Sequence, residues 1–215
     1  MPGWWWLAPV AALGCGLAAV ALTPWLAGTV AGRPSRWYGR RLPGWLSALI
    51  GGAAATLAGT WVQLVTFSLV ALGLGLLVAV DLAEERLPDT LTLPLYPVLL
   101  GGLALDAALG GGWPAVGQAV LAGLVALAVF LLLALLGPLY PGDVKLAGVL
   151  GAWLGWFGWW PVLGGFFAAF ALHALVGIGL MAARRANRST EFAFGPSLVA
   201  GTLIVLVGGR ALGWW

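Results

Sequence analysis

The chain has 215 residues, of which 62% are apolar and only 8% are charged, and its formal net charge is +3. A soluble globular domain carries about 25% charged residues, so this composition excludes that class. A bilayer crossing takes about 20 residues, so this length holds up to about eight or nine membrane helices and leaves none for a separate soluble domain. The sequence predicts an all-α, polytopic membrane protein in which residues 1–215 form a single membrane domain.

Breaks between the apolar runs divide the chain into eight predicted membrane helices. They cover roughly residues 4–27, 45–61, 65–81, 91–108, 114–136, 146–159, 161–183 and 195–212. The apolar stretch 45–80 is too long for one crossing at about 1.5 Å per residue, so we expect two helices that turn near Gln63. No basic residue precedes the first apolar run, so we expect the first helix to be retained rather than cleaved as a signal peptide.

Nine of the ten basic residues follow an odd-numbered helix, and only Arg210 does not. Because short cytoplasmic loops retain Lys and Arg, this side is predicted to be cytoplasmic and both termini to lie outside. The predicted inward loops are 32–44, 84–88, 138–143 and 184–191. Most of the tryptophans fall near the opposite interface, as an aromatic belt does: Trp4, Trp5, Trp6, Trp61, Trp113, Trp159, Trp160, Trp214 and Trp215.

Several classes of site are not supported by the sequence. The basic residues form short clusters rather than a stripe, so nucleic acid is not an expected partner. Cys15 is the only cysteine and His173 the only histidine, and no metal-ligand spacing is present. For His173, an interhelical hydrogen bond is favoured over a role as a ligand.

Carboxylates near a bilayer are costly, so each of the seven needs a reason. Asp106 and Glu191 are expected to be ordinary loop charges. Glu84 and Glu85 are expected to be solvated beside Arg86, with the alternative that they receive a basic partner.

Asp81, Asp89 and Asp143 all lie at predicted helix ends on the inner face. For Asp89, which follows Pro88, capping of the next helix is favoured over catalysis. Asp81 ends an apolar run without an evident structural task, whereas Asp143 opens a helix and is either a cap or a reactive group. Two carboxylates that share one proton are what aspartic proteolysis requires, and Asp81 and Asp143 form the one plausible pair.

Three strings in this order resemble motifs of the type IV prepilin peptidases. Residues 81–94, DLAEERLPDTLTLP, resemble the first aspartate motif of that family. Residues 141–146, PGDVKL, resemble its Gly-x-Gly-Asp-x-Lys motif, with Tyr140 in place of the first glycine. Residues 194–201, FGPSLVAG, are similar to the Phe-Gly-Pro stretch that opens the last helix of the family.

The resemblance implies a membrane aspartic endopeptidase that removes the basic leader from prepilin-like precursors at the cytoplasmic face of the bacterial inner membrane. It implies no metal or organic cofactor, and its partners are the precursor and the lipid bilayer. Residues 65–201 would form the peptidase core, preceded by N-terminal helices and a basic loop in residues 1–64. The implied site comprises Asp81 and Asp143 as the catalytic pair, Gly142, Lys145, Pro88 and Asp89 as supporting residues, and Glu84 and Glu85 as possible receivers of the leader.

Helix polarity distinguishes the two aspartates. Asp143 begins a helix near Lys145 and Asp81 ends one, so we expect Asp143 to be ionised more often and Asp81 to hold the shared proton. We also expect cleavage without N-methylation of the product, because the paired-Cys cytoplasmic segment of larger family members has no counterpart in these residues.

Other classes remain open. A presenilin-like protease would normally place Tyr before its first aspartate, where this chain has Val80. A proton-coupled transporter also needs membrane carboxylates, though usually near the midplane and within repeated halves. A non-catalytic membrane assembly protein would tolerate neutral replacement of Asp81 or Asp143.

Overall fold

The computed structural model describes residues 4–29, 41–110, 112–137, 139–184 and 192–214, and every regular element in them is a helix. Within these described ranges, a short 3₁₀ helix, Trp4–Leu7, precedes eight α-helices. These are α1 (Ala8–Thr29), α2 (Arg41–Leu57), α3 (Trp61–Glu84), α4 (Asp89–Ala108), α5 (Trp113–Leu136), α6 (Pro141–Phe157), α7 (Trp159–Ala182) and α8 (Gly195–Ala211). The predicted all-α class is confirmed.

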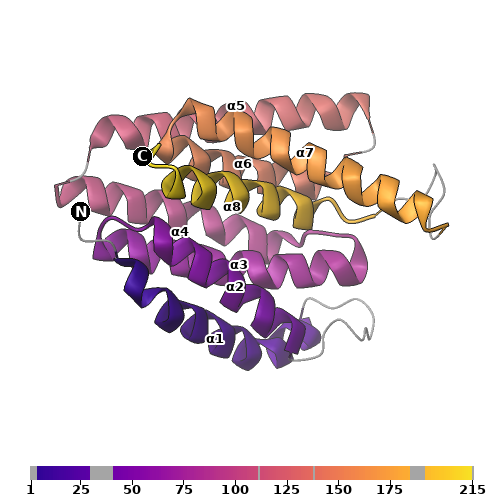
Figure 1. The fold of residues 1–215 in the computed structure, drawn as a ribbon, viewed down its shortest axis with the longest axis horizontal. Helices are drawn as coiled ribbons and strands as arrows, with labels where there is room; N and C mark the ends of the chain where they lie inside the picture. Colours follow the sequence, from indigo (N-terminus) through magenta and orange to yellow (C-terminus); the bar gives the residue numbers. More distant parts are fainter. Residues whose placement is uncertain (1–3, 30–40, 111, 138, 185–191, 215) are drawn as a thin grey trace.

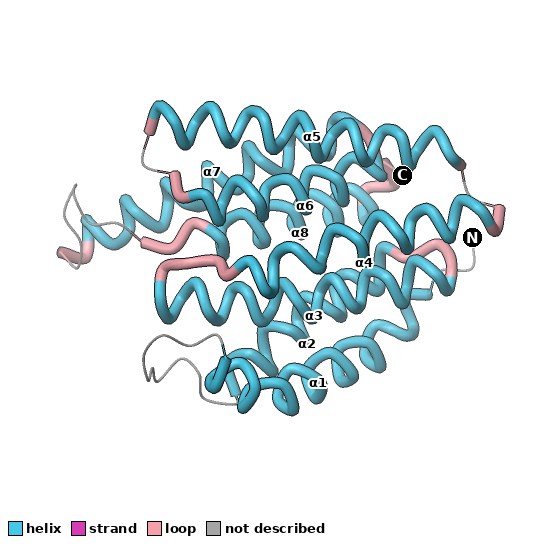
Figure 2. Tube along the Cα trace, turned by 180° about the vertical axis from the view of Figure 1, so that it is seen from behind, coloured by secondary structure: helices cyan, strands magenta, loops and turns pink. Residues whose placement is uncertain are grey.

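The helices run up and down in one bundle, so that successive connections alternate between its two ends (Figures 1 and 2). Both marked termini lie at the same end (Figure 1). Five of the described helices, α1, α3, α4, α5 and α7, are long and apolar enough to cross a membrane. The protein is therefore a polytopic, all-helical membrane protein.

The break between α2 and α3 falls at residues 58–60 rather than at the predicted Gln63. Thr60 has an extended backbone and caps α3, because its side-chain oxygen accepts a hydrogen bond from the amide of Gln63 at 3.1 Å. The pattern Thr-x-x-Gln is a helix-start signature, so the sequence carried a signal for this boundary.

The centre of the bundle is formed by α3 and α6, which contribute more buried residues than any other described helix. Phe67 of α3 packs against Trp153 and Phe157 of α6, with ring centroids 5.4 and 6.1 Å apart. Small residues let α6 approach α5, since a Cβ at Gly151 would lie 2.5 Å from the Cβ of Ala126. The two helices that carry Asp81 and Asp143 are thus the best shielded from the surroundings.

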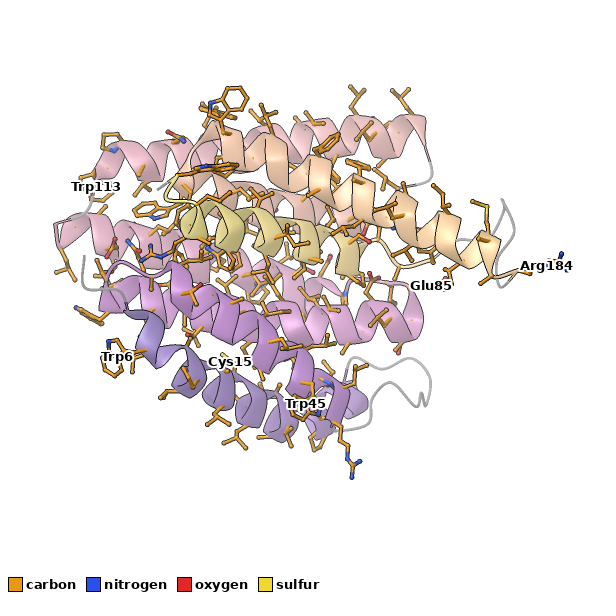
Figure 3. All side chains as sticks on the ribbon, viewed as in Figure 1. Trp6, Cys15, Trp45, Glu85, Trp113 and Arg184 are labelled. Atoms are coloured by element: carbon orange, nitrogen blue, oxygen red, sulfur yellow. The ribbon has the colours of Figure 1, made fainter. Side chains whose placement is uncertain are left out.

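The two ends of the bundle differ in chemistry. At the end where α3 stops and α4, α6 and α8 start, here called the aspartate end, Glu85 and Arg184 are exposed (Figure 3). At the opposite end, here called the tryptophan end, Trp6 and Trp113 project outward (Figure 3). Trp61, Trp159, Trp160 and Trp214 are also exposed there, as an aromatic belt predicts, whereas Trp215 and the side chains of Trp4 and Trp5 lie outside the described part.

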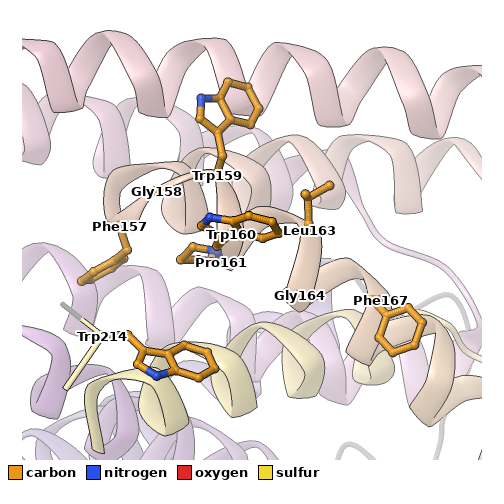
Figure 4. Close-up of a pocket in the computed structure, with 9 residues that line it drawn as sticks. All are labelled: Phe157, Gly158, Trp159, Trp160, Pro161, Leu163, Gly164, Phe167 and Trp214. Atoms are coloured by element: carbon orange, nitrogen blue, oxygen red, sulfur yellow. The ribbon is translucent and has the colours of Figure 1, made fainter. Parts of the chain in front are cut away.

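An apolar hollow of about 910 Å³ lies at the tryptophan end, where α6 turns into α7 (Figure 4). It is lined by Phe157, Gly158, Trp159, Trp160, Pro161, Leu163, Gly164, Phe167 and Trp214. These lining residues include no acid, base or nucleophile, so the hollow offers surface to apolar groups and no reactive chemistry.

Candidate active site

Asp81 lies in the last turn of α3, at the end of a long apolar run. Glu85 ends the helix in the left-handed conformation, with φ 53°, and its amide donates to the Asp81 carbonyl at 2.8 Å. Asp81 is only 3% exposed, and its Oδ2 accepts a hydrogen bond from the amide of Gly195 at 2.9 Å. The chain therefore buries a carboxylate at a helix end and holds it through a backbone amide of another helix.

Asp143 is the third residue of α6, after Pro141 and Gly142, and is 5% exposed. Its Oδ2 accepts from the amide of Tyr140 at 3.2 Å, so the capping contact considered from the sequence is present. Tyr140 has φ −88° and ψ 152°, an extended conformation open to any side chain. The tyrosine in place of the motif glycine therefore brings no backbone strain.

The three sequence strings meet at the aspartate end through Leu87, in the loop between α3 and α4. A Cβ at Gly142 would lie 2.8 Å from the Leu87 Cβ, and a Cβ at Gly195 would lie 3.5 Å from its Cδ2. Leu87 is thus wedged between the starts of α6 and α8, where glycine permits a close approach. The carboxylates of Asp81 and Asp143, 62 positions apart in sequence, are close enough to interact electrostatically.

The two aspartates lie at opposite kinds of helix end, as predicted, but Asp81 also meets a second helix. Asp143 lies in the first turn of α6, as expected, but the first residue of α8 also donates its amide to Asp81. Within the described residues, each aspartate accepts one hydrogen bond through Oδ2, from a backbone amide at a helix start. The helix ends on which the prediction rests are thus present, with a second helix start beside Asp81, and the preference of Asp81 for the shared proton stays a prediction.

Lys145, which follows Asp143 by two positions, forms its ion pair with Asp89. Its Nζ lies 2.6 and 2.8 Å from the two carboxylate oxygens of Asp89 and so forms a bidentate ion pair between α6 and α4. The prediction that Asp89 caps α4 is wrong, since the N-cap is Pro88 and Asp89 is the first helical residue. Tyr96 joins the same helices by donating its hydroxyl to the Lys145 carbonyl at 2.7 Å.

The two loop glutamates differ. Glu84 forms an ion pair with Arg86, with Oε2 and Nε 2.5 Å apart, and its side chain is only 10% exposed. Glu85 is exposed at the aspartate end (Figure 3). Both glutamates were expected to be solvated, but only Glu85 is exposed, whereas Glu84 is enclosed.

Asp106 was predicted as a loop charge, and this is wrong. It lies within α4 at the tryptophan end and is 4% exposed. Its two oxygens accept hydrogen bonds from the Thr60 hydroxyl and from Nε2 of Gln63, the latter at 2.7 Å. Glu191, the other predicted loop charge, lies outside the described residues.

The sequence did not reveal the contacts of His173 or of Gly195. Nδ1 of His173 lies 3.4 Å from the Ser197 hydroxyl, which agrees with the favoured interhelical hydrogen bond. The string 194–201 resembles a family motif, but nothing in the sequence indicates that its glycine amide meets Asp81. In the part of the chain that the structure describes, no group of three or more His, Cys, Asp or Glu side chains could hold a metal ion.

Residues 68–181 match the family described as the Type IV leader peptidase family. The chain is 37% identical over 182 residues to a prepilin leader peptidase/N-methyltransferase of Aeromonas hydrophila, covering 79% of this chain and 58% of that protein. It is 36% identical to the Aeromonas salmonicida (strain A449) protein of that name, covering 80% and 53%, and 34% identical to the Neisseria gonorrhoeae one, covering 63% and 47%.

The chain thus spans about half the length of the curated relatives that it matches. No solved structure matches it. The family match covers more than half of the residues and includes both Asp81 and Asp143. This chain therefore belongs to the type IV leader peptidase family.

Proposed function

We propose that this chain is a membrane aspartic endopeptidase that removes the basic leader peptide from type IV prepilin-like precursors, with Asp81 and Asp143 as its catalytic pair. The observation that carries the proposal is the placement of two buried carboxylates within electrostatic range of each other, in a member of this family. A buried acid is costly unless it is paired or used, and here two such acids share one small region.

The proposed chemistry needs one proton shared by the two carboxylates. The ionised carboxylate takes a proton from water, whose oxygen attacks the carbonyl carbon of the scissile peptide bond. The protonated carboxylic acid donates its proton to the carbonyl oxygen, and the resulting diol collapses as the C–N bond breaks and the amine leaves with a proton. No metal or organic cofactor takes part in this scheme.

The basic leader needs a negative surface near the pair. Glu85 is exposed beside the last turn of α3, whereas Glu84 is enclosed and paired with Arg86. We place the leader-binding charge on Glu85, where it attracts basic residues as the precursor approaches. Glu84 then supports the loop by holding Arg86.

We place the aspartate end at the cytoplasmic face. The described basic residues Arg41, Arg86, Lys145 and Arg184 lie at this end and Arg210 near the opposite one, which supports that orientation. The test uses single cysteines at Thr90 and Gly112 in a Cys15→Ala background. In intact cells an impermeant thiol reagent should label position 112 only, and should label position 90 after permeabilisation. Labelling of position 90 from outside would reverse the orientation.

Cleavage itself is tested by co-expressing the chain with precursors that carry basic leaders and following the change in mobility. The native sequence should yield the shorter product, whereas Asp81→Asn and Asp143→Asn should yield none. Asn keeps the shape of Asp and can still cap a helix, so Asp143→Asn separates capping from catalysis. Normal processing by well-folded protein of either variant would exclude the aspartic mechanism.

Asp106→Asn is the matched control, because it makes the same chemical change in a carboxylate that is equally buried but lies at the tryptophan end. It should process the precursor normally per folded molecule. Equal loss in all three variants would indicate a general defect in folding rather than a catalytic pair.

A further inference from the structure

The start of α8 contributes a contact to the site that the two aspartate motifs do not contain. The amide of Gly195 donates to Oδ2 of Asp81 at 2.9 Å, between residues 114 positions apart, and the bond is buried. A Cβ at position 195 would lie 2.5 Å from that same oxygen. The first turn of α8 therefore fixes the Asp81 carboxylate, and only glycine leaves room for the contact.

His173 of α7 touches this turn on both sides of Gly195. Its Nδ1 lies 3.4 Å from the hydroxyl of Ser197, and its ring meets Phe194 edge-on, with centroids 4.8 Å apart. The ring of His173 also stacks on the ring of Phe192, with centroids 4.1 Å apart and an interplanar angle of 19°. One side chain thus holds residues before and after the glycine whose amide meets Asp81.

We propose that His173 is a positioning residue, which holds the first turn of α8 through Ser197 so that the Gly195 amide fixes the Asp81 carboxylate for the reaction. This inference rests on the proposed function. Apolar packing restrains Phe194 within the bundle, since its ring also lies 5.2 Å from that of Phe170. Packing of this kind is non-directional, whereas the polar contact between His173 and Ser197 fixes the rotation of the turn.

The size of the expected effect follows from the geometry of catalysis. A displacement of about 1 Å in a reacting group lowers the rate by up to about 100-fold even when the altered residue is remote. His173 acts through the turn and not on the substrate. Its loss should therefore lower kcat with little change in KM.

The first test uses His173→Phe, which keeps an aromatic ring for stacking and removes Nδ1, together with Ser197→Ala. Each should lower kcat on the order of tenfold, with KM unchanged, and the double variant should be no worse than either single one. The matched control is Thr202→Val in the same helix, because the buried Thr202 hydroxyl has no hydrogen-bond partner among the residues that the structure describes. It should leave kcat unchanged.

The second test reads the contact itself and needs no activity. The sequence holds two Phe-Gly pairs, at 157–158 and 194–195, so labelling with ¹³C-phenylalanine and ¹⁵N-glycine selects the amides of Gly158 and Gly195. The Gly195 amide resonance should move in Asp81→Asn and in His173→Phe, while that of Gly158 stays in place.

Wild-type kcat in His173→Phe and Ser197→Ala, or a Gly195 amide that does not move in His173→Phe, would overturn the inference. Failure of the proposed function shows differently, as an absence of cleavage by the unmodified chain. The labelled amides are measured in the same preparation and report the contact whether or not cleavage occurs. They therefore distinguish failure of this inference from failure of the proposed function.

Discussion

The two ends of the bundle each bury carboxylate, but they surround it differently. At the tryptophan end, Asp106 has both oxygens bound by side-chain donors, Thr60 and Gln63. At the aspartate end, Asp81 and Asp143 each accept one hydrogen bond from a backbone amide in the described part of the chain, and Asp81 lies within the electrostatic range of Asp143. Burial is nearly the same in all three cases, so burial alone does not identify a site.

The difference lies in what each arrangement leaves available. Two neutral donors that occupy both oxygens stabilise a buried carboxylate and hold it in one place. A pair of carboxylates close together favours sharing a proton, which keeps an acid and a base side by side. Asp106 therefore has the arrangement of a structural residue that joins α4 to the start of α3. Asp81 and Asp143 have the arrangement of a reactive pair.

Apart from the replacement of the two aspartates themselves, the largest expected effect comes from Gly195→Ala at the aspartate end. The new Cβ would approach Oδ2 of Asp81 to 2.5 Å, so either the carboxylate or the turn must move. Cleavage should fall on the order of 100-fold while the helical circular dichroism is retained. Gly208→Ala in the same helix is the control, because a Cβ there meets nothing within 4 Å, and it should cleave normally. Equal activity of the two variants would show that Asp81 does not depend on this contact.

At the tryptophan end we expect a smaller effect, which lowers stability and leaves cleavage unchanged. In Asp106→Asn, one of the two carboxylate positions becomes an NH₂ donor. Facing Gln63, this NH₂ meets the donor Nε2, and the Gln63 side chain is held because its Oε1 accepts from Gly59 at 2.9 Å. Facing Thr60, it leaves the proton of that hydroxyl without its present acceptor, because the hydroxyl oxygen must now accept from the NH₂ as well as from the Gln63 amide. The unfolding free energy should fall by about 1–3 kcal/mol, with cleavage per folded molecule unchanged. Thermal unfolding in detergent measures the loss of stability. A stable but inactive Asp106→Asn protein would contradict the division of roles between the two ends.

Much of the fold was accessible from the sequence because it depends on local properties. Apolar runs of nearly bilayer length, separated by Gly, Pro and charged residues, indicated the eight helices. Asp81 and Asp143 stood out because each is an acid at the end of such a run. The parity of the helices then placed both at one end of the bundle without any knowledge of contacts.

The contacts that define the site were not accessible in the same way, because they join distant positions. Asp106 meets a hydroxyl 46 positions away, and Lys145 meets Asp89 at a separation of 56. An acid near a predicted loop looks solvated when its partners are unknown, which is why the burial of Asp106 was missed. His173 was assigned its kind of contact correctly, but its partner Ser197 and its place beside Gly195 depend on how α7 packs on α8.

The smallest effect is expected for the ion pair that borders the aspartate end. The side chains of Lys145 and Asp89 are 36% and 54% exposed, and exposed pairs contribute about 0–1 kcal/mol to stability. Lys145→Met and Asp89→Asn should each retain most of the cleavage activity, and the double variant should equal either single one, because each removes the same pair. Added salt should shrink the effect of both variants, since exposed charges are screened. If Lys145→Met instead abolished cleavage while Asp89→Asn did not, Lys145 would act on the substrate or on Asp143. The aspartate end would then contain a third group that takes part in the reaction.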